Sequence, residues 1–238
     1  MNKTIALFGA SGGIGSALLD SYLEDSSTDQ VYAFSRRPLQ VTHPKLTHHP
    51  IDISDEGSIQ TACDSIPDTQ PLDEVLVATG VLQGDTFKPE KSSKQLDMAS
   101  LETVFKLNTI GPSILLKYLL PKLRAKSPSK LAVFSARVGS ISDNRLGGWY
   151  AYRASKAALN MIVKTAAIEQ KRRHPEHCII SYHPGSVDTS LSKAFQKTCV
   201  ESFKTPKEAA GYCRAVLDHL SPEQSGQIIA WDGAEIPS

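Results

Sequence analysis

Short apolar runs that alternate with longer amphipathic stretches constrain the fold of this chain more than any other feature of its sequence. The apolar runs have the length and composition of buried β-strands, whereas the amphipathic stretches repeat with the period of an α-helix. We expect strands at residues 4–8, 31–34, 46–50, 75–78, 131–134, 178–182 and 228–231. We expect helices at residues 13–23, 55–66, 99–125, 150–172 and 206–219.

Alternating strands and helices predict a parallel sheet, because each right-handed crossover places its helix on one face of the sheet. The run Val75-Leu76-Val77-Ala78 has no polar residue, as is typical of a strand covered on both faces. The sequence therefore predicts an α/β fold, a Rossmann-type doubly wound parallel sheet of about seven strands with helices on both faces. A chain of 238 residues fits one such domain, so we expect a single domain over residues 1–238.

A glycine-rich turn follows the first expected strand and opens the first expected helix. Its residues are Gly9, Ala10, Ser11, Gly12, Gly13, Ile14 and Gly15. Glycines permit a tight turn and close backbone approach to a pyrophosphate, while the free amides and the dipole of the helix N-terminus favour its charge. The alternative is a purely structural loop, which the strand-turn-helix context disfavours.

The residues after the second expected strand predict the choice of dinucleotide. An NAD enzyme carries an acidic residue there that accepts a hydrogen bond from the ribose 2′-hydroxyl. This chain has Ser35, Arg36 and Arg37 instead, and a guanidinium can bind a 2′-phosphate. We therefore expect NADP(H) rather than NAD(H); two arginines in a solvated loop are the alternative.

Tyr152 and Lys156 are the strongest candidates for catalysis. Residues four apart share one face of a helix, so the phenol and the ammonium can point into the same pocket. A nearby cation stabilises a phenolate, and we expect it to lower the pKa of Tyr152 toward the range of general acid/base catalysis. Tyr150 is a weaker candidate because the residue four positions later is Ala154, which has no charge.

These two motifs together resemble the short-chain dehydrogenase/reductase family, which has Gly-x-x-x-Gly-x-Gly in place of the more general Gly-x-Gly-x-x-Gly. Residues 139–153, which include Gly147-Gly148-Trp149, resemble more closely the subgroup of C-factor and sniffer-type carbonyl reductases. The resemblance to the family covers essentially the whole chain. It implies that Tyr152 exchanges a proton with the substrate, that Lys156 also binds the nicotinamide ribose, and that Asn108 holds a water in a proton relay.

The family also implies a serine that hydrogen-bonds the substrate oxygen, and here the chain departs from the pattern. The fifth strand ends in Ser135-Ala136, so alanine occupies the position of the usual hydroxyl. Either Ser135 turns inward or Ser140 supplies the bond from the following loop; we expect Ser135, because it ends the strand.

Other cofactor contacts follow from the resemblance alone. The implied adenosine contacts come after the third and fourth strands, and the implied nicotinamide contacts come after the sixth strand. They are Asp52, Ile53, Ala78, Thr79, Gly80, Pro184, Gly185, Val187 and Thr189. The asparagines that the family places before Gly80 are absent.

The leading hypothesis is an NADP(H)-dependent reductase of a small-molecule carbonyl compound, acting between a carbonyl and an alcohol. A dinucleotide-binding regulatory or signalling protein of the C-factor type, with weak or no catalysis, is the alternative. A third hypothesis, an NAD-dependent alcohol dehydrogenase, conflicts with Arg36. The family further implies a homodimer or homotetramer in which helices 99–125 and 150–172 pack across an interface.

Composition excludes several other classes. The 26 basic and 25 acidic residues nearly cancel, which gives no reason to expect a nucleic acid or an anionic membrane as partner. We find no signal peptide and no apolar stretch long enough to span a membrane, and we expect a cytoplasmic protein. The scattered cysteines at positions 63, 178, 199 and 213 and the pair His48-His49 suggest neither disulfides nor a metal site. Substrate choice should depend on the irregular segments 82–97, 143–148 and 189–204, the last a candidate lid.

Overall fold

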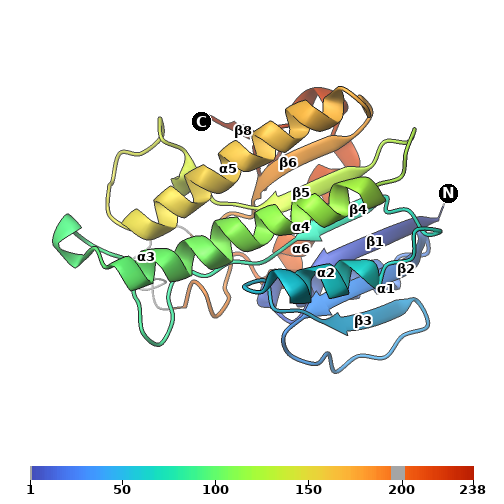
Figure 1. The fold of residues 1–238 in the computed structure, drawn as a ribbon, viewed down its shortest axis with the longest axis horizontal. Coiled ribbons are helices and arrows are strands. Elements are labelled where there is room, and N and C mark those ends of the chain that lie inside the picture. Colours follow the sequence, from blue (N-terminus) through green and yellow to red (C-terminus); the bar gives the residue numbers. More distant parts are fainter. Residues whose placement is uncertain (1, 194–201) are drawn as a thin grey trace.

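All the strands of the computed structural model, which describes residues 2–193 and 202–238, belong to one sheet. The strand order is β3-β2-β1-β4-β5-β6-β7-β8, and every neighbouring pair is parallel except β7 and β8 (Figure 1). The strands are β1 (Lys3–Phe8), β2 (Thr28–Ser35), β3 (Leu46–Pro50), β4 (Glu74–Val77), β5 (Lys130–Phe134), β6 (Cys178–His183), β7 (Ile228–Ala230) and β8 (Glu235–Ile236). The expected doubly wound sheet is confirmed, with a short antiparallel strand added at one edge.

The order of the strands reverses between β1 and β4, which pair side by side at the centre of the sheet. In such a sheet ligands bind beyond the carboxyl ends of the strands at the point of reversal. Phe8 pairs with Val77 there, so the turn after β1 and the segment after β4 leave the sheet together. This pairing brings Gly9 and Ala78 to the same place.

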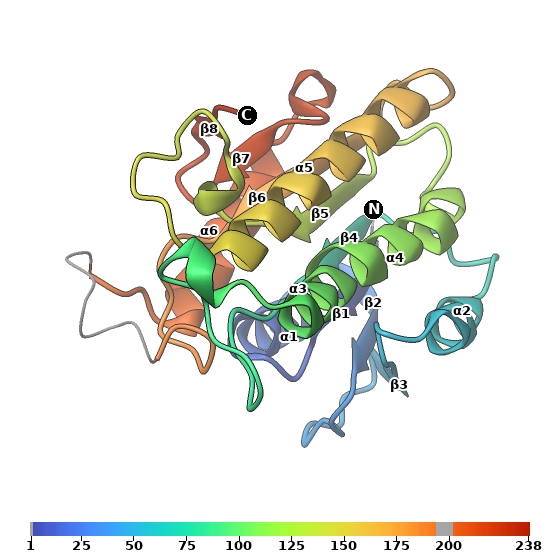
Figure 2. The same ribbon diagram turned by 60° about the vertical axis from the view of Figure 1, so that its left-hand side comes forward.

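Helices cover both faces of the sheet (Figure 2). Helices α1 and α6 pack on one face, over a core that includes Ile5, Leu7 and Tyr182. Helices α2, α4 and α5 pack on the other face, over Phe8, Val75 and Val133. The α-helices are α1 (Gly13–Glu24), α2 (Glu56–Asp64), α3 (Met98–Phe105), α4 (Gly111–Leu119), α5 (Tyr150–Lys171) and α6 (Pro206–His219).

The single helix expected over residues 99–125 is interrupted and shorter than predicted. A π-helical segment, Lys106–Ile110, joins α3 to α4, and a 3₁₀ turn ends the run at Lys122. The helix stops there because Leu123 forms a bridge with Leu72, and Arg124 N donates to Leu72 O at 2.9 Å. The wider π turn is a form that often marks functional sites.

Gly111, the first residue of α4, lies directly against the turn that follows β3. A Cβ atom at Gly111 would lie 2.3 Å from the carbonyl oxygen of Ile53, which is closer than any side chain allows. Glycine therefore lets the backbone of α4 touch residue 53.

The helices expected at an oligomer interface, α4 and α5, run side by side on the outer face of the molecule (Figures 1 and 2). A groove of about 750 Å³ between them is lined in part by Leu116, Leu120 and Ile162. The oligomeric state stays a prediction. In the described parts of the chain, no helix is both long and apolar enough to cross a membrane.

A buried carboxylate ties β1, α1 and β4 together. Glu74 is 3% exposed; it accepts hydrogen bonds from the Tyr22 hydroxyl and from Lys3 Nζ, each at 2.7 Å.

We expect Tyr22→Phe to lower the free energy of unfolding by about 1–3 kcal/mol, because one buried carboxylate oxygen loses its donor. Urea denaturation measures this change. Tyr118→Phe is the control: its hydroxyl makes only long contacts at the surface, and its removal should change stability by less than about 0.5 kcal/mol. Equal losses in the two variants would contradict the assignment.

Candidate active site

The glycine-rich turn lies between β1 and α1 at the point where the strand order reverses. Gly9 N donates to Phe34 O at 2.8 Å, and Gly12 N donates to Gly9 O at 2.9 Å. Gly9 has a φ of +87°, and a Cβ there would lie 2.5 Å from Ala78 O. A Cβ at Gly15 would lie 2.1 Å from Gly9 O. Both glycines are therefore required by close backbone contacts, and Ser11 and Ile14 are carried on the same turn.

The three residues at the end of β2 have different roles in the structure. The Ser35 hydroxyl donates to Arg37 O at 2.6 Å and lies 2.9 Å from His48 Nε2, which fixes the bend after the strand. Arg37 Nη2 donates to Ser11 O at 2.7 Å and so braces the glycine turn. The Arg36 side chain is exposed, and its charge helps to lower the pKa of Asp52. Arg36 is therefore better placed than Arg37 to meet a 2′-phosphate.

The predicted adenosine contacts lie beyond β3 and β4. Asp52 Oδ1 accepts from the backbone and side chain of Ser54, and these bonds hold the pKa of Asp52 below its usual value. Ala78 N donates to Phe8 O at 2.9 Å, which keeps the end of β4 against β1. The Thr79 hydroxyl is buried and has no hydrogen-bond partner among the described residues, so a polar group remains to be satisfied there.

Tyr152 and Lys156 lie on the buried side of α5, one helical turn apart. Tyr152 is 9% exposed and Lys156 is 2% exposed, whereas Tyr150 is 40% exposed and faces solvent. Lys156 Nζ donates to Phe134 O at 2.7 Å and lies 5.9 Å from the centre of the Tyr152 ring. The structure therefore brings the predicted pair together and separates the rival phenol from it.

The pKa expected for Tyr152 was wrong in direction. Burial raises the pKa of Tyr152 to about 12 and lowers the pKa of Lys156 to about 7. Both shifts have one cause, because removing a group from water disfavours its charged form. Lys156 points its Nζ at a carbonyl oxygen and carries little positive charge above neutral pH, so it does not offset the desolvation of the phenol.

Asn108 lies at the centre of the π-helical segment and is fully buried. Its amide is held on both sides by residue 81: Val81 N donates to Oδ1 at 2.7 Å, and Nδ2 donates to Val81 O at 2.8 Å. A Cβ atom at Gly80 would lie 3.3 Å from Lys156 Nζ and 3.4 Å from Asn108 Oδ1. The side chains of Asn108 and Lys156 therefore both lie next to Gly80, in the segment after β4.

The structure gives the two candidate serines, Ser135 and Ser140, different surroundings from those of Ala136. The Ser135 hydroxyl donates to Asn160 Oδ1 at 2.6 Å, inside the layer between β5 and α5. The Ser140 hydroxyl accepts from Asp143 N at 3.1 Å. Of these three residues, Ala136 is the one that belongs to the apolar cluster of Tyr152 and Leu82. Ser135 stays a prediction as the substrate's hydrogen-bond donor, and its present partner is Asn160.

The predicted nicotinamide segment follows β6 and returns toward the glycine turn. Thr189 is close to Gly13, where a Cβ would lie 2.7 Å from Thr189 Cγ2. Val187 forms a bridge with Lys204, and the Lys204 ammonium lies 3.6 Å from the centre of the Trp231 ring beside Gly185. Pro184 begins this segment directly after β6. Of the candidate lid, residues 194–201 lie outside the described residues, as does Cys199.

Several residues of the site were missed by the sequence analysis. Asn160, which holds Ser135, is four residues after Lys156 on the same helix face, so helix periodicity could have found it. The Ser155 hydroxyl, in contact with Asn108 Nδ2 at 3.2 Å, lies inside the Tyr-Lys motif and was equally accessible. Trp149, whose ring meets that of Tyr152 edge to face, was noted only as part of the motif at residues 139–153, and Glu90, which contacts the start of α5, had no signal in the sequence.

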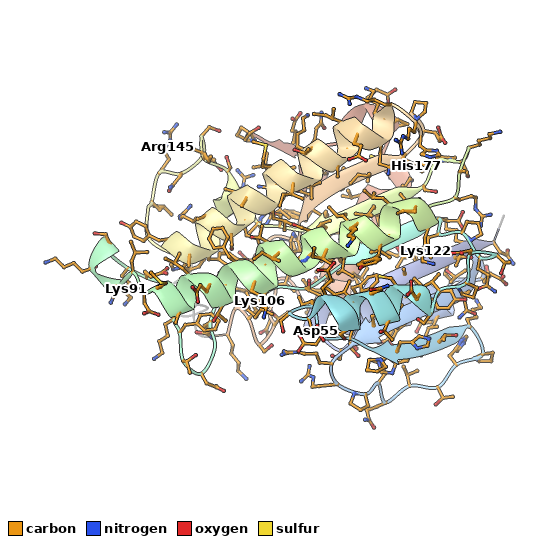
Figure 3. All side chains as sticks on the ribbon, in the orientation of Figure 1. Asp55, Lys91, Lys106, Lys122, Arg145 and His177 are labelled. Carbon is orange, nitrogen blue, oxygen red and sulfur yellow. The ribbon has the colours of Figure 1, made fainter. Side chains whose placement is uncertain are left out.

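A cluster of potential metal ligands lies at the far end of α5, where Figure 3 labels His177. It consists of His174, Glu176 and His177, which the sequence analysis did not consider. The two imidazole rings stack with an angle of 10° between their planes. Nitrogen lone pairs lie in the plane of their ring, so stacked rings do not direct them at one ion.

The residues at the reversal point fit a dinucleotide. Gly9 and Gly15 have no room for a side chain, the buried Thr79 hydroxyl lacks a hydrogen-bond partner among the described residues, and Arg36 adds an exposed positive charge after β2. A pyrophosphate at the N-terminus of α1 would meet free amides, since the first turn of a helix leaves its N–H groups unpaired. Lys156, Asn108 and Tyr152 then lie at the other end of the same edge of the sheet.

Comparison with known proteins agrees with this geometry. A family model described as short chain dehydrogenase matches residues 3–199. The C-signal protein of Myxococcus xanthus is 34% identical over 143 residues, which cover 60% of this chain and 81% of that protein. A benzil reductase of Bacillus subtilis, described as (S)-benzoin forming, is 29% identical over 195 residues, 82% of this chain and 79% of that protein. The NADPH-bound carbonyl reductase from chicken fatty liver is 25% identical and superposes with a TM-score of 0.85 over 100% of this chain and 99% of that one.

The pKa of Lys156 predicts a pH-dependent contribution to stability. The folded chain releases this proton near pH 7, whereas an unfolded chain holds it to about its ordinary value of 10.5. Between these values the unfolded chain binds more protons, so the contribution of Lys156 to stability rises with pH. Between about pH 6 and pH 9, we expect the free energy of unfolding of the wild type to rise by about 1–3 kcal/mol relative to that of Lys156→Met.

Urea denaturation at the two pH values measures that gain. Lys164→Met, at an exposed lysine of the same helix, is the matched control and should show a constant difference from the wild type. A constant difference for Lys156→Met as well would contradict the assignment.

Proposed function

The chain belongs to the short-chain dehydrogenase family, and we propose that it reduces a ketone or aldehyde with NADPH, using Tyr152 as the general acid. The predicted family, including the resemblance to C-factor and sniffer-type carbonyl reductases, is confirmed, and with it an oxidoreductase that acts on small substrates. The observation that carries the proposal is the placement of Tyr152, Lys156 and Asn108 at the carboxyl edge of the sheet, beside the chain after β4.

Tyr152 is suited to donate a proton. NADPH, when bound, supplies the hydride that reduces the carbonyl carbon. Burial raises the pKa of Tyr152 to about 12, so its phenol is protonated at neutral pH and can transfer that proton to the carbonyl oxygen. The general acid then needs a source of protons, because its own proton leaves in every turnover.

Lys156 and Asn108 support the proton transfer by position. Lys156 Nζ, held on Phe134 O, stands 5.9 Å from the phenol ring centre, where a positive charge would stabilise the phenolate that the transfer leaves behind. Asn108 has both polar atoms of its amide fixed by residue 81, so its carbonyl group cannot rotate away from the side facing Gly80. We propose that the protonated form of Lys156 returns a proton to Tyr152, and that Asn108 holds a water through which Lys156 regains its proton from solvent.

Arg36 supports the preference for NADP(H). Arg36 is exposed and occupies the sequence position after β2 at which an NAD enzyme has an acidic residue, and Arg37 is already bonded to Ser11 O. The carbonyl reductase from chicken fatty liver is described with NADPH, and by analogy we assign the same cofactor here.

Ala136 favours a second candidate function. Its methyl group packs on Tyr152 where a hydroxyl donor usually lies, and the match to C-signal keeps open a regulatory protein that binds the dinucleotide with weak or no catalysis. Loss of one donor to a developing oxyanion costs about 10²–10³ in kcat. The two candidate functions therefore differ in whether bound NADPH is turned over.

The first test is consumption of NADPH, followed by its absorbance, with a panel of aldehydes, ketones and quinones. We expect turnover that Tyr152→Phe reduces at least about 10²-fold, because the phenol alone donates the proton. Tyr150→Phe removes the exposed phenol two residues earlier and should leave kcat within about twofold. Tight binding of NADPH without turnover of any compound would favour the regulatory function, and Ala136→Ser would then be the first variant to assay for restored activity.

The second test concerns the cofactor. We expect Arg36→Ala to raise the Kd of NADPH about 10–100-fold, the value of a charge-assisted hydrogen bond, and to change the Kd of NADH by less than about twofold. Fluorescence titration of the purified protein measures both constants. Arg145→Ala, which removes the exposed arginine labelled in Figure 3, is the control for net charge. Equal losses for the two nucleotides would overturn the assignment of the 2′-phosphate to Arg36.

A further inference from the structure

Helix α5, which carries Tyr152, begins in an unusual backbone conformation. Gly147, Gly148 and Trp149 have φ values of +63°, +65° and +52°, so three residues in a row are left-handed. A left-handed conformation costs a residue with a side chain about 1–2 kcal/mol, and Trp149 has one of the largest side chains. Strained residues persist only where their surroundings hold them, and they gather at functional sites.

The first turn of α5 lacks the residues that usually stabilise a helix N-terminus. Trp149, at the N-cap, has an indole N–H that can donate but not accept, and the first turn contains no acidic residue. The free N–H groups of that turn need an acceptor, and a negative charge is favoured beside them.

Glu90, from a distant part of the chain, supplies both the acceptor and the negative charge. This residue lies in the long segment between β4 and α3, and it is 3% exposed. Its carbonyl oxygen accepts from Trp149 N at 2.6 Å, and its carboxylate oxygen Oε2 accepts from Ala151 N at 3.2 Å. The neighbouring Lys91, labelled in Figure 3, is exposed. Glu90 thus holds the strained entry and caps the helix at once.

The groups that Glu90 holds adjoin the general acid on two sides. Ala151 precedes Tyr152 in the chain, and the Trp149 ring meets the Tyr152 ring edge to face, with their centres 6.2 Å apart. Trp149 packs against the apolar cluster of Tyr152 and Ala136, and Ala151 is buried. A shift in the first turn of α5 would therefore move the phenol directly.

We propose that Glu90 is a positioning residue for the reaction: through Trp149 and Ala151 it fixes the place of the Tyr152 phenol. The proposal rests on the proposed function of Tyr152. The carboxylate acts through backbone groups, since one of its oxygens is occupied by Ala151 N. Lys156 has its own anchor on Phe134 O one turn farther along, so loss of Glu90 leaves the cofactor side of the helix in place.

The test compares Glu90→Ala and Glu90→Gln with Asp55→Ala. Asp55, labelled in Figure 3, is a matched control, because its carboxylate caps α2 by accepting from Gly57 N at 3.1 Å. We expect Glu90→Ala to lower kcat about 10–100-fold, as misplacement of a reacting group does, with the Kd of NADPH within about twofold. Glu90→Gln keeps an oxygen for Ala151 N and should stay within about threefold of the wild type. Asp55→Ala should lose stability but keep its kcat.

A spectroscopic readout tests the same proposal without turnover. In a Trp231→Phe background Trp149 is the single tryptophan, and its emission reports the packing at the start of α5. We expect Glu90→Ala to shift this emission to the red and to increase quenching by acrylamide, and Glu90→Gln to change neither. If the wild type turns over no carbonyl compound, the proposed function fails and this measurement still decides whether Glu90 holds Trp149. Wild-type kcat or unchanged emission in Glu90→Ala would overturn the proposal, as would an equal loss of kcat in Asp55→Ala.

Discussion

The parallel pairing of β1 with β4 is the constraint on which the rest of the structure depends. It places the chain after each strand at the same edge, so that Gly9 meets Ala78 O too closely for any side chain. The turn to α1, the bracing of that turn by Arg37 and the path of the segment past Gly80 all follow from this contact. The binding edge is therefore built mostly from backbone, and glycine is needed where two backbones touch.

The two ends of this edge differ in how far their polar groups are exposed to water. Exposed Arg36 and the backbone amides of the glycine turn remain available to an anion, whereas Tyr152 and Lys156 are removed from water, which disfavours the charged form of each. A neutral phenol is the form that a proton donor requires. Neutral Lys156 stays in place because Phe134 O accepts from its Nζ, and this bond does not depend on its charge.

Local patterns predicted most of the fold and much of the site. The apolar runs identified the seven parallel strands, and the four-residue spacing of Tyr152 and Lys156 placed them together, because both patterns depend on neighbours in sequence. The features that were missed depend on distant contacts. The helix expected to reach residue 125 ends early because Leu123 pairs with Leu72, and Glu90 caps a helix that begins 60 residues later. The pKa of Tyr152 was wrong in direction because its burial could not be read from the spacing.

The contact between Gly111 and the carbonyl of Ile53 has a consequence for the energetics of binding. It joins the turn after β3 to the start of α4, one residue beyond the π-helical segment that carries Asn108. A backbone contact with no intervening side chain has no rotamers to adjust, so the two ends of the binding edge keep a fixed spacing before any ligand arrives. The entropic cost of fixing that spacing is met during folding, so the binding of a long ligand that spans the edge does not include this cost.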